Sequence, residues 1–147
     1  MSVTDDFQQI VKQVETARHH YHAGDSAPFK ALWSHADDVT LLGAVGAYAK
    51  GWEQVGPRLD GVAAHFREGR GWSIEPLALG MNGDLAYTVH IERSEMRVAG
   101  RDEWSPVSLR VTHIYRREEG TWKIIHRHAD AIMERIEVMA TLQQEGA

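Results

Sequence analysis

His90 and Glu92 are the residues in this sequence best suited to acid–base chemistry. They lie two positions apart in a stretch that reads as a strand, so they share one face with Thr88. An imidazole and a carboxylate between apolar walls can acquire pKa values that suit proton transfer. Alternation alone favours burial of the other face, which leaves His90 and Glu92 in water. The alternative, which a functional site requires, is that the face with His90 and Glu92 points inward. The other face carries Tyr87, Val89 and Ile91.

Two groups of histidines have side chains that could bind a metal. His126, His128 and Asp130 alternate along one predicted strand, and His19 and His22 lie one helical turn apart. Neither spacing is specific, because a metal site also needs converging geometry. We therefore predict a structural role for the first group and a solvated helix end for the second. No metal and no other cofactor is predicted.

The stretch from Leu109 to Asp130 predicts two long strands joined at Glu118-Glu119-Gly120. β-Branched and aromatic residues suit a pleated surface, and a glycine at the end of a three-residue connection suits a bulged hairpin. In that register His113 lies opposite Ile125. Strict alternation then gives two faces that both mix apolar and ionisable groups. One face carries Arg110, Thr112, Ile114, Trp122, Ile124, His126, His128 and Asp130, and the other carries Leu109, Val111, His113, Tyr115, Ile125, Arg127 and Ala129.

The elements that must position these residues fall into two groups along the chain. Apolar residues at three- and four-residue steps predict helices first, and from Trp72 onward the period changes to two. Pro57 is expected to end or kink the third helix. Helices followed by a run of long antiparallel strands define the α+β class. The predicted helices cover residues 4–24, 26–33, 52–66 and 133–144, and the predicted strands cover 39–44, 72–79, 85–98, 104–117 and 121–132.

Composition excludes several classes of function. The chain has 147 residues, a formal net charge of −5 and no cysteine. The length favours one domain spanning residues 1–147, and the missing cysteines exclude disulfides and thiolate metal sites. No basic cluster indicates a nucleic-acid partner. Because no apolar run approaches the ~20 residues of a membrane span and the N-terminus lacks signal-peptide features, we expect a cytoplasmic protein without a membrane partner.

Five short motifs span nearly the full chain. They are Tyr21-His22-Ala23-Gly24-Asp25, Gly51-Trp52-Glu53-Gln54-Val55, Gly83-Asp84-Leu85-Ala86-Tyr87, Arg110-Val111-Thr112 and Gly120-x-Trp122-Lys123-Ile124-Ile125-His126-x-His128. In this order they resemble the nuclear-transport-factor-2-like superfamily, in its SnoaL-like branch. The last motif is similar to the closing hairpin of the calcium/calmodulin-dependent kinase II association domain. The motifs indicate a fold and not an activity, because the superfamily includes isomerases, dehydratases, cyclases, epoxide hydrolases and non-catalytic oligomerising modules.

The resemblance implies a cone, in which a strongly bent sheet wraps around the N-terminal helices and a pocket opens at the wide end. It also implies a homodimer or higher homo-oligomer, often formed through the outer sheet face. In this fold the face with Thr88, His90 and Glu92 points inward. The candidate catalytic residues are then His90, Glu92 and His113, and the candidate substrate-binding residues are Tyr21, Trp33, Trp52, Tyr115 and Arg127.

Some pocket positions depart from the kinase association domain. Glu92, His113 and Ala129 occupy positions that carry arginine in that domain. We therefore do not expect this chain to bind the ligands of that domain.

Three functional hypotheses remain from the sequence. The first is a small-molecule-binding cone protein that acts as a cofactor-free isomerase, lyase or cyclase on a hydrophobic carbonyl compound, with Tyr115 or Arg127 stabilising an enolate oxygen. The second is a non-catalytic oligomerisation or ligand-sensing module of the same fold. The third, a histidine-based metal protein, has the least support.

Overall fold

The computed structural model describes residues 3–44, 46–98, 102–132 and Leu142. Three helices and six strands form these parts of the chain. The predicted C-terminal helix at 133–144 lies outside the described residues except for Leu142. None of the described helices has the length and apolar character needed to cross a membrane.

Helix α1, Asp5–Tyr21, has an apolar stripe facing the sheet and acidic residues in its first turn, where they stabilise the positive end of the helix dipole. The chain leaves α1 through Gly24, whose φ is +98°. A Cβ at that position would lie 2.8 Å from the carbonyl oxygen of Phe66, so only glycine fits between α1 and the first residue of β3. This close approach holds the C-terminal end of α1 against the sheet.

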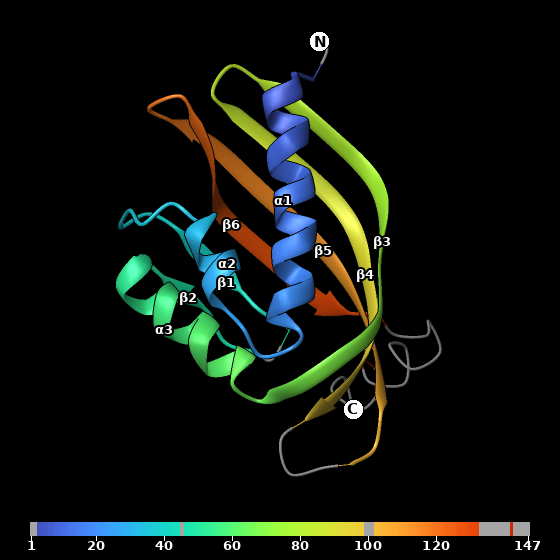
Figure 1. Cartoon of the computed structure of the whole chain (residues 1–147). Helices are drawn as coiled ribbons and strands as arrows, with labels where there is room; N and C mark the ends of the chain where they lie inside the picture. The colour runs from blue at the N-terminus through green and yellow to red at the C-terminus, as the bar shows by residue number, and fades with distance from the viewer. Residues whose placement is uncertain (1–2, 45, 99–101, 133–141, 143–147) are drawn as a thin grey trace.

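The other two helices are short and lie to one side of α1 (Figure 1). Helix α2, Ala27–Ala31, has Pro28 in its first turn, where a missing N–H is tolerated. Helix α3, Trp52–Ala63, continues past Pro57, so this residue does not end the helix. The helix also ends three residues before the predicted limit, because strand β3 begins at Phe66.

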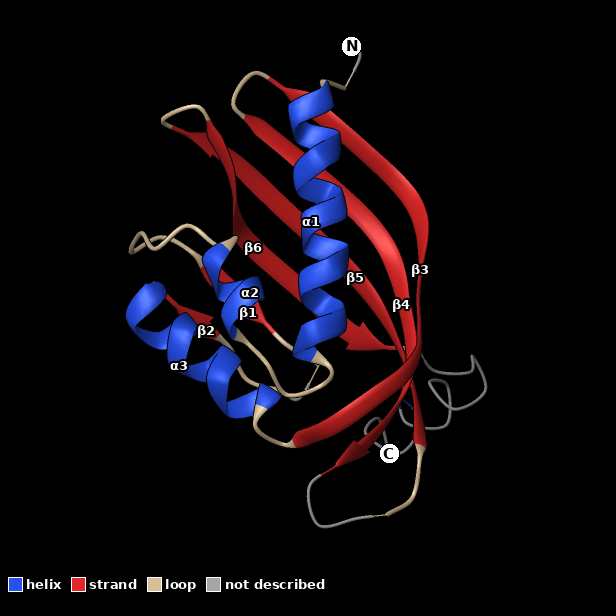
Figure 2. Ribbon diagram, viewed as in Figure 1, coloured by secondary structure: helices blue, strands red, loops and turns tan. Residues whose placement is uncertain are grey.

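The six strands form one curved, unclosed sheet in the order β2-β1-β6-β5-β4-β3. Figure 2 shows this sheet wrapping around α1, with α1 across its concave face. Strand β1 pairs parallel to β6, and all other neighbours are antiparallel. The expected α+β cone is therefore confirmed. The strands are β1 Thr40–Leu42, β2 Ala49–Lys50, β3 Phe66–Asn82, β4 Leu85–Val98, β5 Ser105–Glu118 and β6 Thr121–Ala131.

The hairpin between β5 and β6 differs from the predicted register in two ways. Its connection has two residues, Glu119 and Gly120, both with positive φ, which is the geometry of a type I′ turn. In addition, Tyr115 pairs with Ile124 whereas Ile114 pairs with His126, so Ile125 is an extra residue on β6. As a result His113 lies opposite Arg127 and not Ile125.

The bulge at Ile125 changes which side chains of β6 face the core. The predicted register places Trp122 and Ile124 on the face opposite to His113 and Tyr115, but both are buried. Beyond the bulge, Arg127 and Ala129 are also buried, because the extra residue reverses the alternation. The Phe7 ring packs edge-on against Tyr115 and Trp122, at centroid distances of 5.1 and 5.2 Å. The two ends of β6 therefore both contribute to the inner face.

The structure shows which face of strand β4 points to the core. Thr88, His90 and Glu92 are buried on the concave face, whereas Tyr87 on the other face is 44% exposed. The inner face of this sheet thus holds ionisable groups, and they lie beneath helix α1.

Candidate functional site

A cluster of buried polar side chains lies where α1 crosses the inner face of the sheet. Its centre is Glu92 on β4, whose side chain is only 1% exposed. The surrounding groups come from α1 and from strands β4, β5 and β6, which the curvature of the sheet brings together. The cluster contains Arg18, His22, Thr88, His90, Glu92, Ser94, His113, Tyr115 and Arg127.

The Glu92 carboxylate accepts four hydrogen bonds. Arg127 donates two of them, from Nη1 to Oε2 at 3.0 Å and from Nη2 to Oε1 at 3.1 Å. Arg18 Nη2 donates to Oε1 at 3.3 Å, and His90 Nε2 lies 2.8 Å from Oε2. Burial raises the pKa of Glu92, but the positive charges of Arg127 and Arg18 and the hydrogen bonds outweigh it and hold the pKa well below 4.5. Glu92 is therefore ionised at neutral pH.

The Arg18 guanidinium is held by aromatic rings as well as by Glu92. The Arg18 guanidinium lies 4.3 Å from the Tyr21 ring centroid and 4.8 Å from that of Phe29. Burial, with the neighbouring charge of Arg127, lowers the pKa of Arg18 to about 10. Arg18 thus stays protonated at neutral pH, and its position is fixed from several sides.

Two histidines accept hydrogen bonds from these guanidiniums. His22 Nε2 lies 3.0 Å from Arg18 Nη2, and His113 Nε2 lies 3.0 Å from Arg127 Nη1. Burial and then the adjacent Arg18 lower the pKa of His22 to about 3, and burial and then Arg127 hold the pKa of His113 well below 6.5. Both imidazoles are neutral at neutral pH, so each can use Nε2 as an acceptor.

The charges in this cluster do not balance. Arg18 and Arg127 each carry a positive charge, the two neutral histidines carry none, and Glu92 supplies the single negative charge. The two guanidiniums therefore exceed the one carboxylate by one positive charge, in a region that is almost closed to water.

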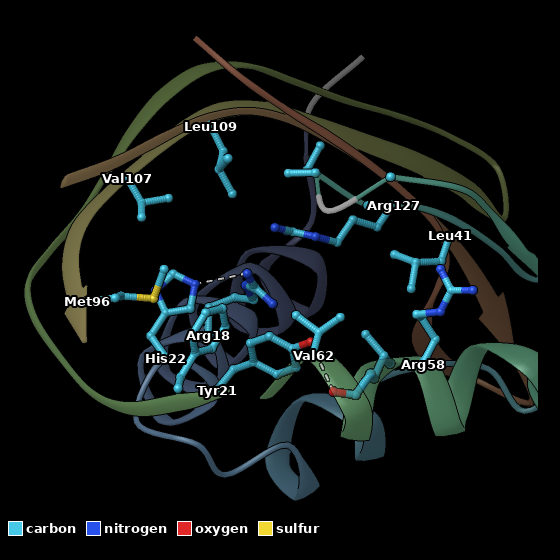
Figure 3. A pocket seen from close by; sticks show the side chains of 16 residues that line it. Arg18, Tyr21, His22, Leu41, Arg58, Val62, Met96, Val107, Leu109 and Arg127 are labelled. Carbon is cyan, nitrogen blue, oxygen red and sulfur yellow. Dashed lines mark hydrogen bonds between the residues drawn. The ribbon is translucent and has the colours of Figure 1, made fainter. Parts of the chain in front are cut away.

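A cavity of about 210 Å³ opens beside this cluster. Figure 3 shows Arg18 and Arg127 with their guanidiniums directed into it from α1 and β6. Apolar side chains from the sheet and from α3 form most of the remaining wall, among them Leu41, Leu59, Val62, Phe66, Met96, Val107, Leu109 and Ala129. The cavity thus combines apolar walls with a positively charged inner end.

The structure distributes the predicted site residues over three environments. Tyr21 and Arg127 line the cavity. The side chains of His90, Glu92, His113 and Tyr115 lie on the same inner face, buried behind the guanidiniums. Trp33 and Trp52 belong elsewhere, because Trp33 is 1% exposed in the core beside Ile124 and Trp52 stacks on His35 at 3.9 Å.

Three polar residues of the cavity wall are absent from the sequence-based site: Arg18, His22 and Arg58. Arg18 could have been recognised from the sequence, because it occupies the apolar stripe of α1. An arginine is unusual there unless it is paired. His22 follows it by one turn.

Two of the side chains considered as metal ligands have other partners. His126 Nδ1 lies 2.7 Å from Thr40 Oγ1, and Asp130 accepts two hydrogen bonds of 2.7 Å from Arg110. Across the described parts of the chain, no three histidine or acidic side chains converge in a geometry that could hold a metal ion.

Several solved structures share this fold. A protein from Thiobacillus denitrificans, provisionally named a calcium/calmodulin-dependent protein kinase type II association domain, is 18% identical, with a TM-score of 0.71 over 90% of this chain and 100% of that chain. A provisionally named dehydratase of the NTF2-like family from Streptomyces avermitilis is 19% identical, with a TM-score of 0.73 over 89% and 100%. A ketosteroid isomerase-like protein from Erwinia carotovora atroseptica is 14% identical, with a TM-score of 0.73 over 88% and 95%.

These similarities define an NTF2-like cone. The sequence itself matches the SnoaL-like domain over residues 10–134, and the chain belongs to that family. No curated protein matches the sequence. At identities below 20% the structural relatives share the fold with this chain, and their names do not assign its activity.

Proposed function

We propose that this protein binds a small organic anion, with the acidic group against Arg18 and Arg127 and an apolar body in the cavity. The observation that carries this proposal is the unequal pairing of two buried guanidiniums with one carboxylate. A ligand carboxylate supplies the missing negative charge. Arginine suits this role, because its planar guanidinium binds carboxylates through paired hydrogen bonds.

The size of the cavity limits the ligand. An apolar protein cavity of about 150 Å³ holds benzene. At about 210 Å³, this cavity has room for one ring or a short alkyl chain together with an acidic group. Phenylacetate has these features and is a suitable probe.

The bonding of Glu92 supports binding more than proton transfer. A general base must accept a proton near the working pH, but the pKa of Glu92 is held far below that range. Its oxygens already accept hydrogen bonds from Arg18, His90 and Arg127. We therefore assign Glu92 the role of a fixed counter-ion that keeps the guanidiniums in place.

Calorimetric titration with phenylacetate and phenylacetamide tests the proposal. The two probes have nearly the same shape and differ in charge, so the acid should bind and the amide should bind at least about tenfold more weakly. Arg127→Gln should weaken binding of the acid by about tenfold to hundredfold. Arg93→Gln is the matched control, because Arg93 is half exposed and pairs with Glu75 away from the cavity. Equal binding of acid and amide would refute the proposal.

A cofactor-free isomerase, lyase or cyclase is the second candidate. The observation in its favour is the buried contact between His90 Nε2 and Glu92 Oε2 at 2.8 Å, one hydrogen bond away from the cavity-lining Arg127. On this hypothesis His90 accepts the proton that leaves the substrate when the enolate forms, and a guanidinium stabilises the enolate oxygen. His90→Ala should then abolish turnover and leave the assembly unchanged. Full activity of that variant on a true substrate would eliminate His90 as the catalyst.

We further propose that a second copy of the chain covers the outer face of the sheet. Large apolar side chains are exposed there on neighbouring strands: Leu77 on β3, and Leu85 and Tyr87 on β4. Such a patch is unusual on a monomer and suits a self-complementary interface. Sedimentation should show a dimer or larger assembly for the natural protein and a smaller species for Leu85→Lys. A natural protein that sediments as a monomer would contradict this assignment.

A further inference from the structure

Arg58 gives the cavity a second positively charged region. It lies on α3, next to Leu59 and one turn before Val62, which line the cavity with it. Figure 3 shows its guanidinium well separated from those of Arg18 and Arg127. The cavity therefore has arginine at two places on its wall, with apolar surface between them.

Arg58 also differs from the other arginines of the cavity in its partners. Arg18 and Arg127 both bind Glu92, whereas within the described parts of the chain the Arg58 guanidinium has no hydrogen bond and no ion pair. The side chain is only partly exposed, so water reaches it incompletely. A partly buried cation without an anion is free to bind one from a ligand.

The charge balance of the whole cavity extends this observation. Three arginines line the cavity and no aspartate or glutamate does. The single carboxylate behind them is Glu92. Two positive charges therefore remain, one at the inner end and one at Arg58.

From this arrangement we infer that the ligand is an organic dianion, with two carboxylates joined by an apolar spacer. One carboxylate binds at Arg18 and Arg127, and the other binds at Arg58. The inference rests on the proposed function and adds the second acidic group. The apolar spacer lies along the apolar wall of the cavity.

Paired series of straight-chain acids test this inference. Adipate, pimelate and suberate are titrated against the natural protein beside hexanoate, heptanoate and octanoate, which have equal carbon numbers and one carboxylate. Since Arg58 is partly exposed, the second ion pair should strengthen binding by about fivefold for the diacid whose length matches the site. Adipamate, with one acid replaced by an amide, should bind like hexanoate.

Arg58→Gln assigns the effect to one residue. This variant should remove the advantage of the diacid, so that each diacid binds like the monoacid of equal carbon number. Arg93→Gln removes the same charge from the surface and should keep the advantage. Thermal unfolding of both variants checks that they are folded.

The outcomes separate this inference from the proposed function. Equal affinity for diacids and monoacids, or a diacid advantage that persists in Arg58→Gln, overturns the inference. Neither result contradicts the proposed binding of one acidic group at Arg18 and Arg127. Failure of both series to bind the natural protein overturns both.

Discussion

The Arg127 guanidinium and the Glu92 carboxylate form a two-point ion pair, with hydrogen bonds of 3.0 and 3.1 Å between side chains that are 5% and 1% exposed. The partners lie on β6 and β4, with β5 between them. Arg18 adds a third positively charged donor from α1. The ion pair thus connects the concave face of the sheet to the helix that lies across it.

Removal of the Glu92 charge should destabilise the fold strongly. Glu92→Gln leaves two buried guanidiniums without an anion, and breaking a buried ion pair in this way costs about 3–5 kcal/mol. Urea unfolding measures the change in the free energy of unfolding. Glu75→Gln is the control, because the ion pair between Glu75 and Arg93 is half exposed and should contribute less than about 1 kcal/mol. Similar losses in the two variants would contradict the role of Glu92 as a buried counter-ion.

The free energy of unfolding should fall as the pH drops below about 6.5. The pKa values of His22 and His113 are lower in the folded protein than the ordinary value of 6.5, so below that pH the unfolded chain takes up protons that the folded chain does not. His22 should cost about 2 kcal/mol by about pH 5, and His113 adds a loss in the same direction. Glu92, whose pKa is also lower in the folded state, adds a loss in the same direction below 4.5.

Urea unfolding at a series of pH values checks this dependence. His113→Asn removes one of the two titrating imidazoles and should flatten the curve between pH 6.5 and about pH 5. His65→Asn is the control, because His65 is exposed on the protein surface. A free energy of unfolding that stays constant over this pH range would show that the buried histidines do not titrate as described.

The bulge in β6 predicts unequal effects at two adjacent isoleucines. Ile124 is fully buried, so Ile124→Ala should cost about 2–5 kcal/mol, whereas Ile125→Ala, at a half-buried bulge position, should cost less than about 1.5 kcal/mol. Thermal or urea unfolding of both variants measures the difference. The strict alternation predicted from the sequence requires the opposite order, so that result would place the bulge elsewhere.

Filling the cavity should block ligand binding without unfolding the protein. Leu109 lines the cavity and is partly exposed, so Leu109→Trp can place its ring in the open space and should change the free energy of unfolding by less than about 1.5 kcal/mol. Calorimetry should then detect at least about a tenfold loss of phenylacetate affinity. Leu42→Trp, on an exposed neighbour of the cavity residue Leu41, is the control and should bind normally. Normal binding by Leu109→Trp would place the ligand elsewhere.

The elements predicted best are those with a strong and uniform pattern. Strand β4 has the predicted bounds, Leu85–Val98, because polar and apolar residues alternate through its first half and Asn82-Gly83 marks the preceding turn. Strand β3 begins at Phe66, earlier than the predicted Trp72. The residues between Phe66 and Trp72 are charged or glycine, so they lack the alternation of apolar and polar residues that indicates a strand.

The candidate site was harder to predict because its contacts join distant parts of the chain. Glu92 was predicted, but its donors Arg18 and Arg127 lie 74 and 35 positions away. The orientation of Arg127 also depends on the bulge at Ile125, and a single extra residue leaves no trace in the pattern of apolar residues. The motif resemblance therefore identified the inner face, and only the three-dimensional structure showed which charges meet there.

The sharing of Glu92 between two arginines makes the cluster unequally tolerant of mutation. If either Arg18 or Arg127 is lost, the carboxylate keeps the other arginine and the hydrogen bond from His90. If Glu92 is lost, no second acid in the cluster replaces it. Loss of one arginine therefore leaves every buried charge of the cluster with a partner, whereas loss of the acid leaves two buried cations facing each other.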